Sequence, residues 1–347
     1  MTVVAGASAA DPRTPVHILT GFLGSGKTTL LRRLLGDPAL ADTAVVINEF
    51  GEVGLDQLLV REVAEDVILL SSGCLCCTVR DDLISTLADL HRMMRSGEVP
   101  SFTRAVVETT GLADPAPIMQ AVLSAKELTS CYQLGQVITT VDGLNGARTL
   151  KSHREARQQS AMADRIVVTK CDLIGEGETD ALVLELSELN PHAAIRLSGR
   201  NESSAWDLLT GSGAHWHLPP PHMSSDTPWE PSGHAHAHEG STHDGTIGTF
   251  TVFPGEAIDW EAFVDWLELL LASRGDSILR VKGLLDVRGD DRPVVLQGVQ
   301  HVLYPPERLP EWPASSPPGG WIVFIARDLT HSAIERSLRS TLAGAQL

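Results

Sequence analysis

The stretch Gly21–Thr29 constrains this chain of 347 residues more than any other, because it reads Gly-Phe-Leu-Gly-Ser-Gly-Lys-Thr-Thr. It fits the phosphate-binding pattern G-x-x-x-x-G-K-T. The apolar run Val16–Leu19 before it predicts a buried strand, and Leu30–Leu35 after it predicts a helix that ends at Gly36. A strand, a glycine loop and a helix in this order direct backbone N–H groups and a helix N-terminus at a bound phosphate.

This loop therefore predicts a site for a nucleoside triphosphate. Lys27 is expected to reach the β- and γ-phosphates and to act in catalysis, and the Thr28 hydroxyl is expected to hold Mg²⁺. The residues of the loop predicted to touch the nucleotide are Gly24, Ser25, Gly26, Lys27, Thr28 and Thr29.

Short apolar segments alternate with helical patterns through the N-terminal part of the chain. The predicted strands are Val16–Leu19, Thr43–Ile47, Asp66–Leu70, Arg104–Val107, Gln136–Val141, Arg165–Val168 and Ala194–Leu197. The predicted helices besides the first are 81–94, Pro117–Ser124, His153–Met162 and Thr179–Leu189. This alternation predicts an α/β fold, a P-loop NTPase parallel sheet with helices on both faces. Ligands of such sheets lie beyond the carboxyl ends of the strands.

The composition of the sequence changes three times along the chain, which predicts four parts. Residues 1–15 are expected to form a flexible N-terminal tail and 16–214 the nucleotide-binding domain. Residues 215–245 are rich in Pro and His, and we expect a disordered linker because such a composition buries no core. Residues 246–347 predict a small α+β C-terminal domain. Its elements are expected at Thr246–Phe253, a helix capped by Asp259, Ser277–Leu285, Val294–Leu303, Trp321–Ala326 and Thr330–Leu342.

Charge and cysteine content narrow the class of protein. The formal net charge is −17, which argues against nucleic acid and anionic membranes as partners. No apolar run approaches the roughly 20 residues of a membrane span, and the first residues do not resemble a secretory signal. We therefore expect a cytoplasmic protein. With 5 Cys, clustered thiols predict metal or redox chemistry rather than structural disulfides.

The segment Thr169-Lys170-Cys171-Asp172 follows a predicted strand, as a guanine-reading N-K-x-D motif does. The Asp172 carboxylate is expected to accept the N1 hydrogen and the exocyclic amine of guanine, a donor pair that adenine lacks. Lys170 is expected to pack along the base and the phosphate loop, and Ser198 to lie at the base edge. Thr169 replaces the usual Asn, so its hydroxyl would bond either the base or the phosphate loop.

Glu108 and Gly111 follow the strand predicted at Arg104–Val107. A carboxylate in this position reaches Mg²⁺ or orients the attacking water, so Glu108 is a candidate magnesium ligand and catalytic residue. Gly111 would let a backbone N–H approach the γ-phosphate and register its loss.

Cys74-Leu75-Cys76-Cys77 places three thiols close together after another predicted strand. Thiolates this close repel one another unless a cation is bound, and they favour Zn²⁺ or Cu⁺ over hard ions. The set is incomplete, which suggests an open site that Glu49 or Glu52 would complete; the alternative is a redox-active or merely buried cluster. The tract His234–Asp244 would bind a divalent metal loosely or would be simple linker composition. The separate Cys131 and Cys171 are expected in the core.

Taken together, these motifs resemble those of CobW-like metallochaperone GTPases, relatives of the UreG and HypB nickel-insertion GTPases. The motifs that carry the resemblance are Gly21–Thr29, Asn48–Gly51, Gly73–Cys77, Glu108–Pro115, Thr169–Asp172, Arg280–Leu284 and Gln297–His301. The resemblance implies a GTPase whose Cys-x-Cys-Cys loop holds Zn²⁺ and which releases the ion to a client apo-metalloprotein when GTP is hydrolysed. It implies Cys74, Cys76, Cys77 and Glu49 as metal ligands, Thr28 and Glu108 for Mg²⁺, and Asp172 for guanine.

Several alternatives remain open at this stage. The delivered metal would be Co²⁺ or Fe²⁺ if the client belongs to cobalamin synthesis or resembles nitrile hydratase. A passive metal buffer built on the His tract, and a small-molecule kinase that uses ATP, are the alternatives from other classes. The resemblance is also compatible with a homodimer that forms across the nucleotide-binding face.

Overall fold

The computed structural model describes residues 13–48, 69–71, 79–199, 247–313 and 316–344. The chain divides into two compact units, Met1–His215 and Trp216–Leu347, which are described separately below. Cys74, Cys76, Cys77, Glu49 and the His tract lie outside the described residues. In the part of the chain that is described, no helix has the length and apolar character needed to cross a membrane.

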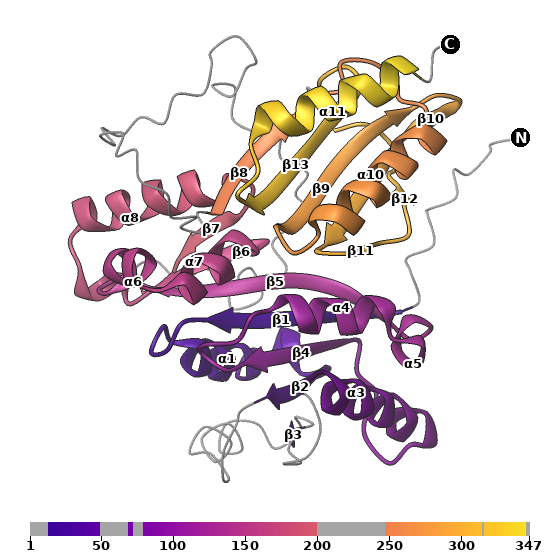
Figure 1. The fold of residues 1–347 in the computed structure, drawn as a ribbon. Helices are drawn as coiled ribbons and strands as arrows, with labels where there is room; N and C mark the ends of the chain where they lie inside the picture. Colours follow the sequence, from indigo (N-terminus) through magenta and orange to yellow (C-terminus); the bar gives the residue numbers. More distant parts are fainter. Residues whose placement is uncertain (1–12, 49–68, 72–78, 200–246, 314–315, 345–347) are drawn as a thin grey trace, which may run out of the picture. The chain divides into compact units, whose positions relative to one another are not determined.

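The first unit is built on a seven-stranded sheet in the order β3-β2-β4-β1-β5-β6-β7 (Figure 1). Every pairing is parallel, as the sequence predicts. The strands are β1 (Thr14–Gly21), β2 (Thr43–Asn48), β3 (Leu69–Ser71), β4 (Arg104–Thr109), β5 (Tyr132–Asp142), β6 (Arg165–Thr169) and β7 (Ala194–Leu197). Strand β1 lies between β4 and β5, so the phosphate loop leaves the middle of the sheet.

Helices connect the parallel strands. They are α1 (Lys27–Leu35), α3 (Val79–Ser96), α4 (Ala116–Ser124), α5 (Lys126–Thr129), α6 (Gly146–Ser152), α7 (Arg154–Ala161) and α8 (Glu176–Leu189), with 3-10 turns η1 (Pro38–Leu40) and η2 (Cys171–Leu173). Every side chain of β6 is buried, so the sheet is covered on both faces. On one face the leucines of α1 pack against Val45, Val106 and Ile138.

The boundaries differ from the predicted ones where local geometry decides. Helix α1 begins at Lys27 rather than Leu30, because Gly26 takes a left-handed conformation (φ 93°) just before it. The strand predicted to end at Val107 continues to Thr109, so Glu108 lies inside β4 instead of beyond it. The short helices α5 and α6 were not predicted, since neither is long enough to show a helical apolar period.

The second unit is an antiparallel sheet with two helices, the small α+β fold that the sequence predicts. Its elements are β8 (Ile247–Val252), α10 (Trp260–Arg274), β9 (Ile278–Val287), β10 (Asp290–Val299), β11 (Val302–Leu303), β12 (Glu307–Arg308), β13 (Gly320–Arg327) and α11 (His331–Gly344). The main order is β11-β10-β9-β13-β8, with β12 beside β10. Phe263 and Leu267 of α10 and Ile334 of α11 join one core with the sheet.

The second unit confirms one predicted helix cap and divides one predicted strand in two. The Asp259 side chain caps α10 as expected, accepting a hydrogen bond from the Ala262 N–H at 3.1 Å. The single strand predicted at Val294–Leu303 was wrong: it is β10 and β11, separated by a turn in which Gln300 has φ 51°. That turn folds the apolar run back on itself as a tight hairpin.

Candidate nucleotide-binding site

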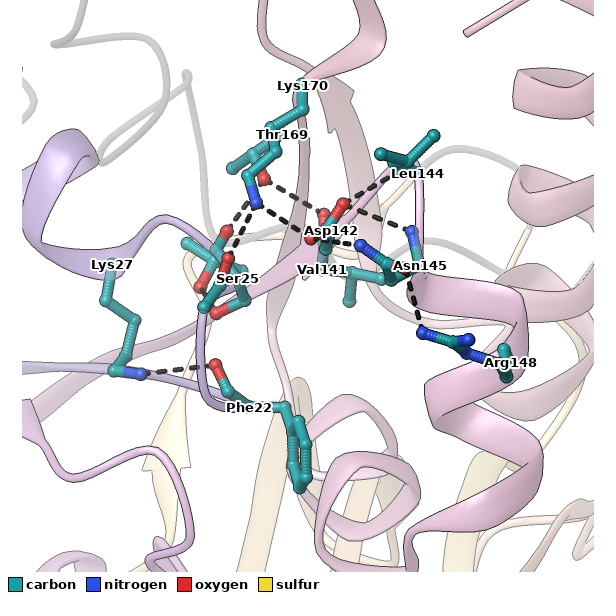
Figure 2. A network of polar contacts seen from close by, with 12 residues as sticks. Phe22, Ser25, Lys27, Val141, Asp142, Leu144, Asn145, Arg148, Thr169 and Lys170 are labelled. Carbon is teal, nitrogen blue, oxygen red and sulfur yellow. Dashed lines mark hydrogen bonds and ion pairs between the residues drawn. The ribbon is translucent and has the colours of Figure 1, made fainter. Parts of the chain in front are cut away.

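The predicted phosphate loop connects β1 to α1, and its carbonyl groups hold the side chain of its own lysine. Lys27 Nζ donates hydrogen bonds to the carbonyl oxygens of Gly21 (2.8 Å) and Phe22 (3.3 Å). Figure 2 shows the Lys27–Phe22 bond, with the Phe22 ring directed away from it. Phosphate oxygens carry charge and accept stronger hydrogen bonds than carbonyls, so they would compete well for this ammonium group.

Thr28 and Glu108 are 80 positions apart in the sequence and meet in the structure. Thr28 Oγ1 donates to Glu108 Oε1 at 3.2 Å. Strand β4 lies beside β1, with Glu108 opposite Leu19, and this pairing carries the carboxylate to the start of α1. Glu108 is buried. A hydroxyl and a carboxylate oxygen are donor groups that Mg²⁺ accepts, so this pair fits a magnesium site.

The segment after β6 is tied directly to the phosphate loop. Thr169 Oγ1 donates to the Ser25 carbonyl at 2.7 Å, so this hydroxyl bonds the loop. Lys170, which has a left-handed backbone (φ 56°), donates through Nζ to the Gly24 carbonyl at 2.9 Å. Figure 2 shows both contacts converging on the loop. The two ties fix the residues after β6 relative to the phosphate loop.

Asp172 and Ser198 lie at the ends of adjacent strands. Strands β6 and β7 pair side by side, and the Cys171 N–H donates to the Ser198 carbonyl at 3.4 Å. Gly199 has φ 107°, a backbone conformation that favours glycine, and a Cβ added to it would lie 2.8 Å from Asp172 Oδ1. Asp172 is exposed, and Ser198 Oγ accepts a 2.7 Å bond from Arg33.

Sequence reasoning missed Asp142, the last residue of β5. Its Oδ2 accepts a 2.8 Å bond from Lys170 Nζ, and Asn145 Nδ2 donates to the same oxygen at 3.2 Å. Burial alone would raise the pKa of this carboxyl, but the bonds from Lys170 and Asn145, with the Lys170 charge, lower it below its usual value. Asp142 thus stays ionised and holds Lys170 from the side opposite the loop (Figure 2). Its signal was an acidic residue ending an apolar strand.

A pocket of about 490 Å³ opens beside the phosphate loop. Its walls are the loop residues Phe22–Ser25, the end of β5, helices α6 and α7, and Lys170. The rings of Phe22 and His153 lie 4.5 Å apart at this wall. The pocket therefore adjoins the loop on the side of α6 and α7.

The remaining site predictions lie partly outside the described residues. Gly111 is buried against the phosphate loop, and Thr29 is exposed on α1. The described residues contain no group of three or more His, Cys, Asp and Glu arranged to hold a metal. Strands β2 and β3 pair in parallel, and the described residues of these neighbouring strands end at Asn48 and Ser71. Cys171 is buried, as expected of a core residue; Cys131 is partly exposed, and burial raises the pKa of its thiol.

Comparison with known proteins agrees with this architecture. Residues 15–196 match the family described as CobW/HypB/UreG, nucleotide-binding domain, and 247–342 match the Cobalamin synthesis protein cobW C-terminal domain. Zinc chaperone YjiA of Escherichia coli K12 is 32% identical over 95% of this chain and 98% of its own length. Zinc chaperone CobW of a Sinorhizobium species is 30% identical over 84% of this chain and 87% of its own.

A solved structure resembles the whole described fold. The crystal structure of Zn(II)-bound YjiA GTPase from E. coli has a TM-score of 0.65 and 25% sequence identity, covering 95% of this chain and 99% of that one. The family matches together span both units. This chain therefore belongs to the CobW/HypB/UreG family and carries a CobW C-terminal domain.

Proposed function

We propose that this protein is a GTP-hydrolysing metal chaperone that binds Zn²⁺ at the Cys74–Cys77 loop and delivers it to a client metalloprotein. The observation that supports the GTPase half is the pair of hydrogen bonds from Thr169 and Lys170 to the phosphate loop, which connect the segment proposed to read guanine to the loop proposed to bind the triphosphate. The zinc-chaperone names of the two relatives above support the metal half. We place this activity in the cytoplasm, where thiols stay reduced.

In this proposal the described residues divide the work on the nucleotide. Lys27 leaves its loop carbonyls for the β- and γ-phosphates, and Asp172 accepts both donors of the guanine edge beside Gly199. Thr28 and Glu108 hold Mg²⁺, which neutralises charge on the phosphates when bound. Glu108 also orients the attacking water, and Gly111 responds to loss of the γ-phosphate.

The proposed metal ligands Cys74, Cys76, Cys77 and Glu49 follow strands that end side by side. Strands β2 and β3 pair in parallel, and their carboxyl ends lie on the same side of the sheet as the carboxyl end of β1, which precedes the phosphate loop. That adjacency supports a coupling in which GTP and GDP states bind Zn²⁺ with different affinity. A nucleotide shifts the metal affinity only if it binds the metal-loaded and the metal-free protein with different affinities.

Two measurements test the proposal. GTP hydrolysis should be measurable and slow in the absence of a client, and Asp172→Ala should abolish the preference for GTP over ATP. Competitive zinc titration should give different affinities with a non-hydrolysable GTP analogue and with GDP, and Cys76→Ala/Cys77→Ala should remove that zinc. Equal zinc affinity in both nucleotide states would contradict the coupling.

Further experiments identify the delivered metal and the client protein. Raw affinity follows the Irving–Williams order whatever metal is delivered, so metal analysis of the protein isolated from its native host separates zinc delivery from cobalt or iron delivery. Deleting Gly233–Asp244 separates loop-based delivery from buffering by the His tract. If metal delivery disappears with this deletion while GTP hydrolysis persists, the His tract contributes more to delivery than the Cys-loop proposal assigns to it. Co-purification of an apo-metalloprotein with the GTP-bound form identifies the client.

A further inference from the structure

Gln159 of α7 reaches out of its helix to hold the loop that follows β4. Its side-chain Nε2 donates to the carbonyl oxygens of Gly111 (3.3 Å) and Ala113 (3.0 Å). Gln159 is 1% exposed, so these bonds form away from water. Only the NH₂ end of the amide donates, and the reverse orientation would set oxygen against two carbonyl oxygens. The two contacts therefore fix the amide in one orientation.

The loop held in this way rests on the phosphate loop. A Cβ added to Gly111 would lie 2.8 Å from the Leu23 N and 2.9 Å from its Cα. The Gly111 backbone is thus enclosed, with the tip of the phosphate loop on one side and Gln159 on its carbonyl. The same strand end carries Glu108, which Thr28 bonds. A shift of this loop would alter the spacing between Gly111 and the phosphate loop.

The helix that carries Gln159 is itself anchored firmly. Thr139 Oγ1 of β5 donates to the Gln159 backbone carbonyl at 2.8 Å. The end of α7 is held by Asn190 Nδ2, which donates to the carbonyls of Ser160, Ala161 and Ala163 at 3.0, 2.8 and 2.9 Å. A side chain on a supported helix positions a loop more precisely than another loop does.

We propose that Gln159 is a positioning residue for the γ-phosphate: it keeps the Gly111–Ala113 loop at the distance from the phosphate loop that GTP requires and GDP does not. This inference rests on the proposed GTPase function and adds a residue on α7 to its machinery. Gln159 acts through the loop and touches no phosphate itself. Its removal therefore affects the GTP state and leaves the GDP state nearly unchanged.

The test compares two substitutions in the full-length protein. Gln159→Met keeps the length of the side chain and removes both donors, and Gln159→Glu places a carboxylate against two carbonyl oxygens. For Met we expect the dissociation constant of GDP to change less than twofold. The constant of a non-hydrolysable GTP analogue should rise, and kcat should fall, by about tenfold, the scale of one or two lost hydrogen bonds. The Gln159→Glu variant should show the larger effect on both the dissociation constant of the GTP analogue and kcat.

Tyr132→Phe is the control, because it also removes a buried side-chain hydrogen bond to a backbone carbonyl, that of Leu87 at 3.0 Å, and it leaves both α7 and the Gly111 loop alone. It should lower the melting temperature without changing the ratio of GTP to GDP affinity. The proposal is overturned if Gln159→Met changes both nucleotide constants by the same factor, or neither. If the wild-type protein does not hydrolyse GTP, the proposed function fails instead, whatever the variants do.

Discussion

His17 is a buried imidazole in the central strand β1, where its Nδ1 accepts a hydrogen bond from the Gln136 N–H at 3.1 Å. Burial lowers its pKa from 6.5 to about 4; the charges of Arg104 and Arg165 add to the decrease and Asp164 opposes it. The folded protein therefore keeps this ring neutral at mildly acidic pH. An unfolded chain would protonate the same ring near its ordinary value.

The sign of the resulting pH dependence follows from proton uptake. Between pH 6.5 and about 4 the unfolded chain binds a proton that the folded chain does not, so the free energy of unfolding falls as the pH decreases. His17 should account for about 2 kcal/mol of the loss between pH 7 and pH 5. His17→Asn keeps an acceptor for Gln136 and cannot titrate in this range. Urea unfolding at pH 7 and at pH 5 should show that the free energy of unfolding falls by about 2 kcal/mol less in the variant than in the wild type. An equal decrease in the two proteins would contradict the assignment to His17.

At the scale of elements, side chains at the carboxyl ends of the parallel strands connect these strand ends to one another and to the phosphate loop. Thr169 and Lys170 at the end of β6 hold the phosphate loop after β1, and Asp142 at the end of β5 holds Lys170. On the other side of β1, Thr28 bonds Glu108 of β4. These contacts join the loops after four adjacent strands into one unit. The phosphate loop is thus shaped by its neighbours as well as by its glycines.

Substitution of Thr169 tests this fastening. Thr169→Val has nearly the same shape but cannot donate to the Ser25 carbonyl. Because the loop serves GTP and GDP alike, both dissociation constants should rise together, by roughly three- to tenfold. Equilibrium binding of fluorescent GDP and GTP analogues measures this, with Thr249→Val of the second unit as the control. A change in GTP affinity alone would show that Thr169 acts on the γ-phosphate rather than on the loop.

At the scale of the molecule, each unit has its own apolar core. The leucines of α1 pack on the parallel sheet of the first unit. Phe263, Leu267 and Phe324 belong to the core of the second. All the described residues of the candidate nucleotide site lie within the first unit. A unit with its own core folds alone in most proteins.

Separating the units tests this organisation and the domain limits predicted from the sequence, 16–214 and 246–347. Residues 1–215 expressed alone should bind GTP within threefold of the full chain, since the site is complete in that fragment. Residues 216–347 should unfold in a single cooperative transition followed by circular dichroism. The nucleotide domain depends on the second unit if the full chain binds nucleotide but the fragment 1–215 aggregates or binds none.

Most helices and strands could be predicted because the patterns that indicate them span only a few neighbouring residues. Apolar runs marked the strands, and the glycine pattern marked the phosphate loop. The failures came where non-local geometry decides. The hairpin turn at Gln300 divides a segment that the sequence predicts as one strand, and α5 and α6 are too short to show a period. Asp142 and Gln159 carry no motif. Lys170 lies 28 positions from Asp142, and Ala113 and Gly111 lie 46 and 48 positions from Gln159.

By itself the sequence determined the parallel α/β fold, the second α+β unit, and the residue types that suit a nucleotide, magnesium and zinc. These predictions depend on hydrophobic periodicity and on the chemistry of side chains, and both can be read from residues that are close together in the sequence. Only the tertiary structure decided that Thr169 bonds the phosphate loop, that Asp142 holds Lys170, and that Gln159 supports the Gly111 loop. Strand order sets those contacts, because parallel pairing brings to one edge of a sheet residues that the chain keeps far apart.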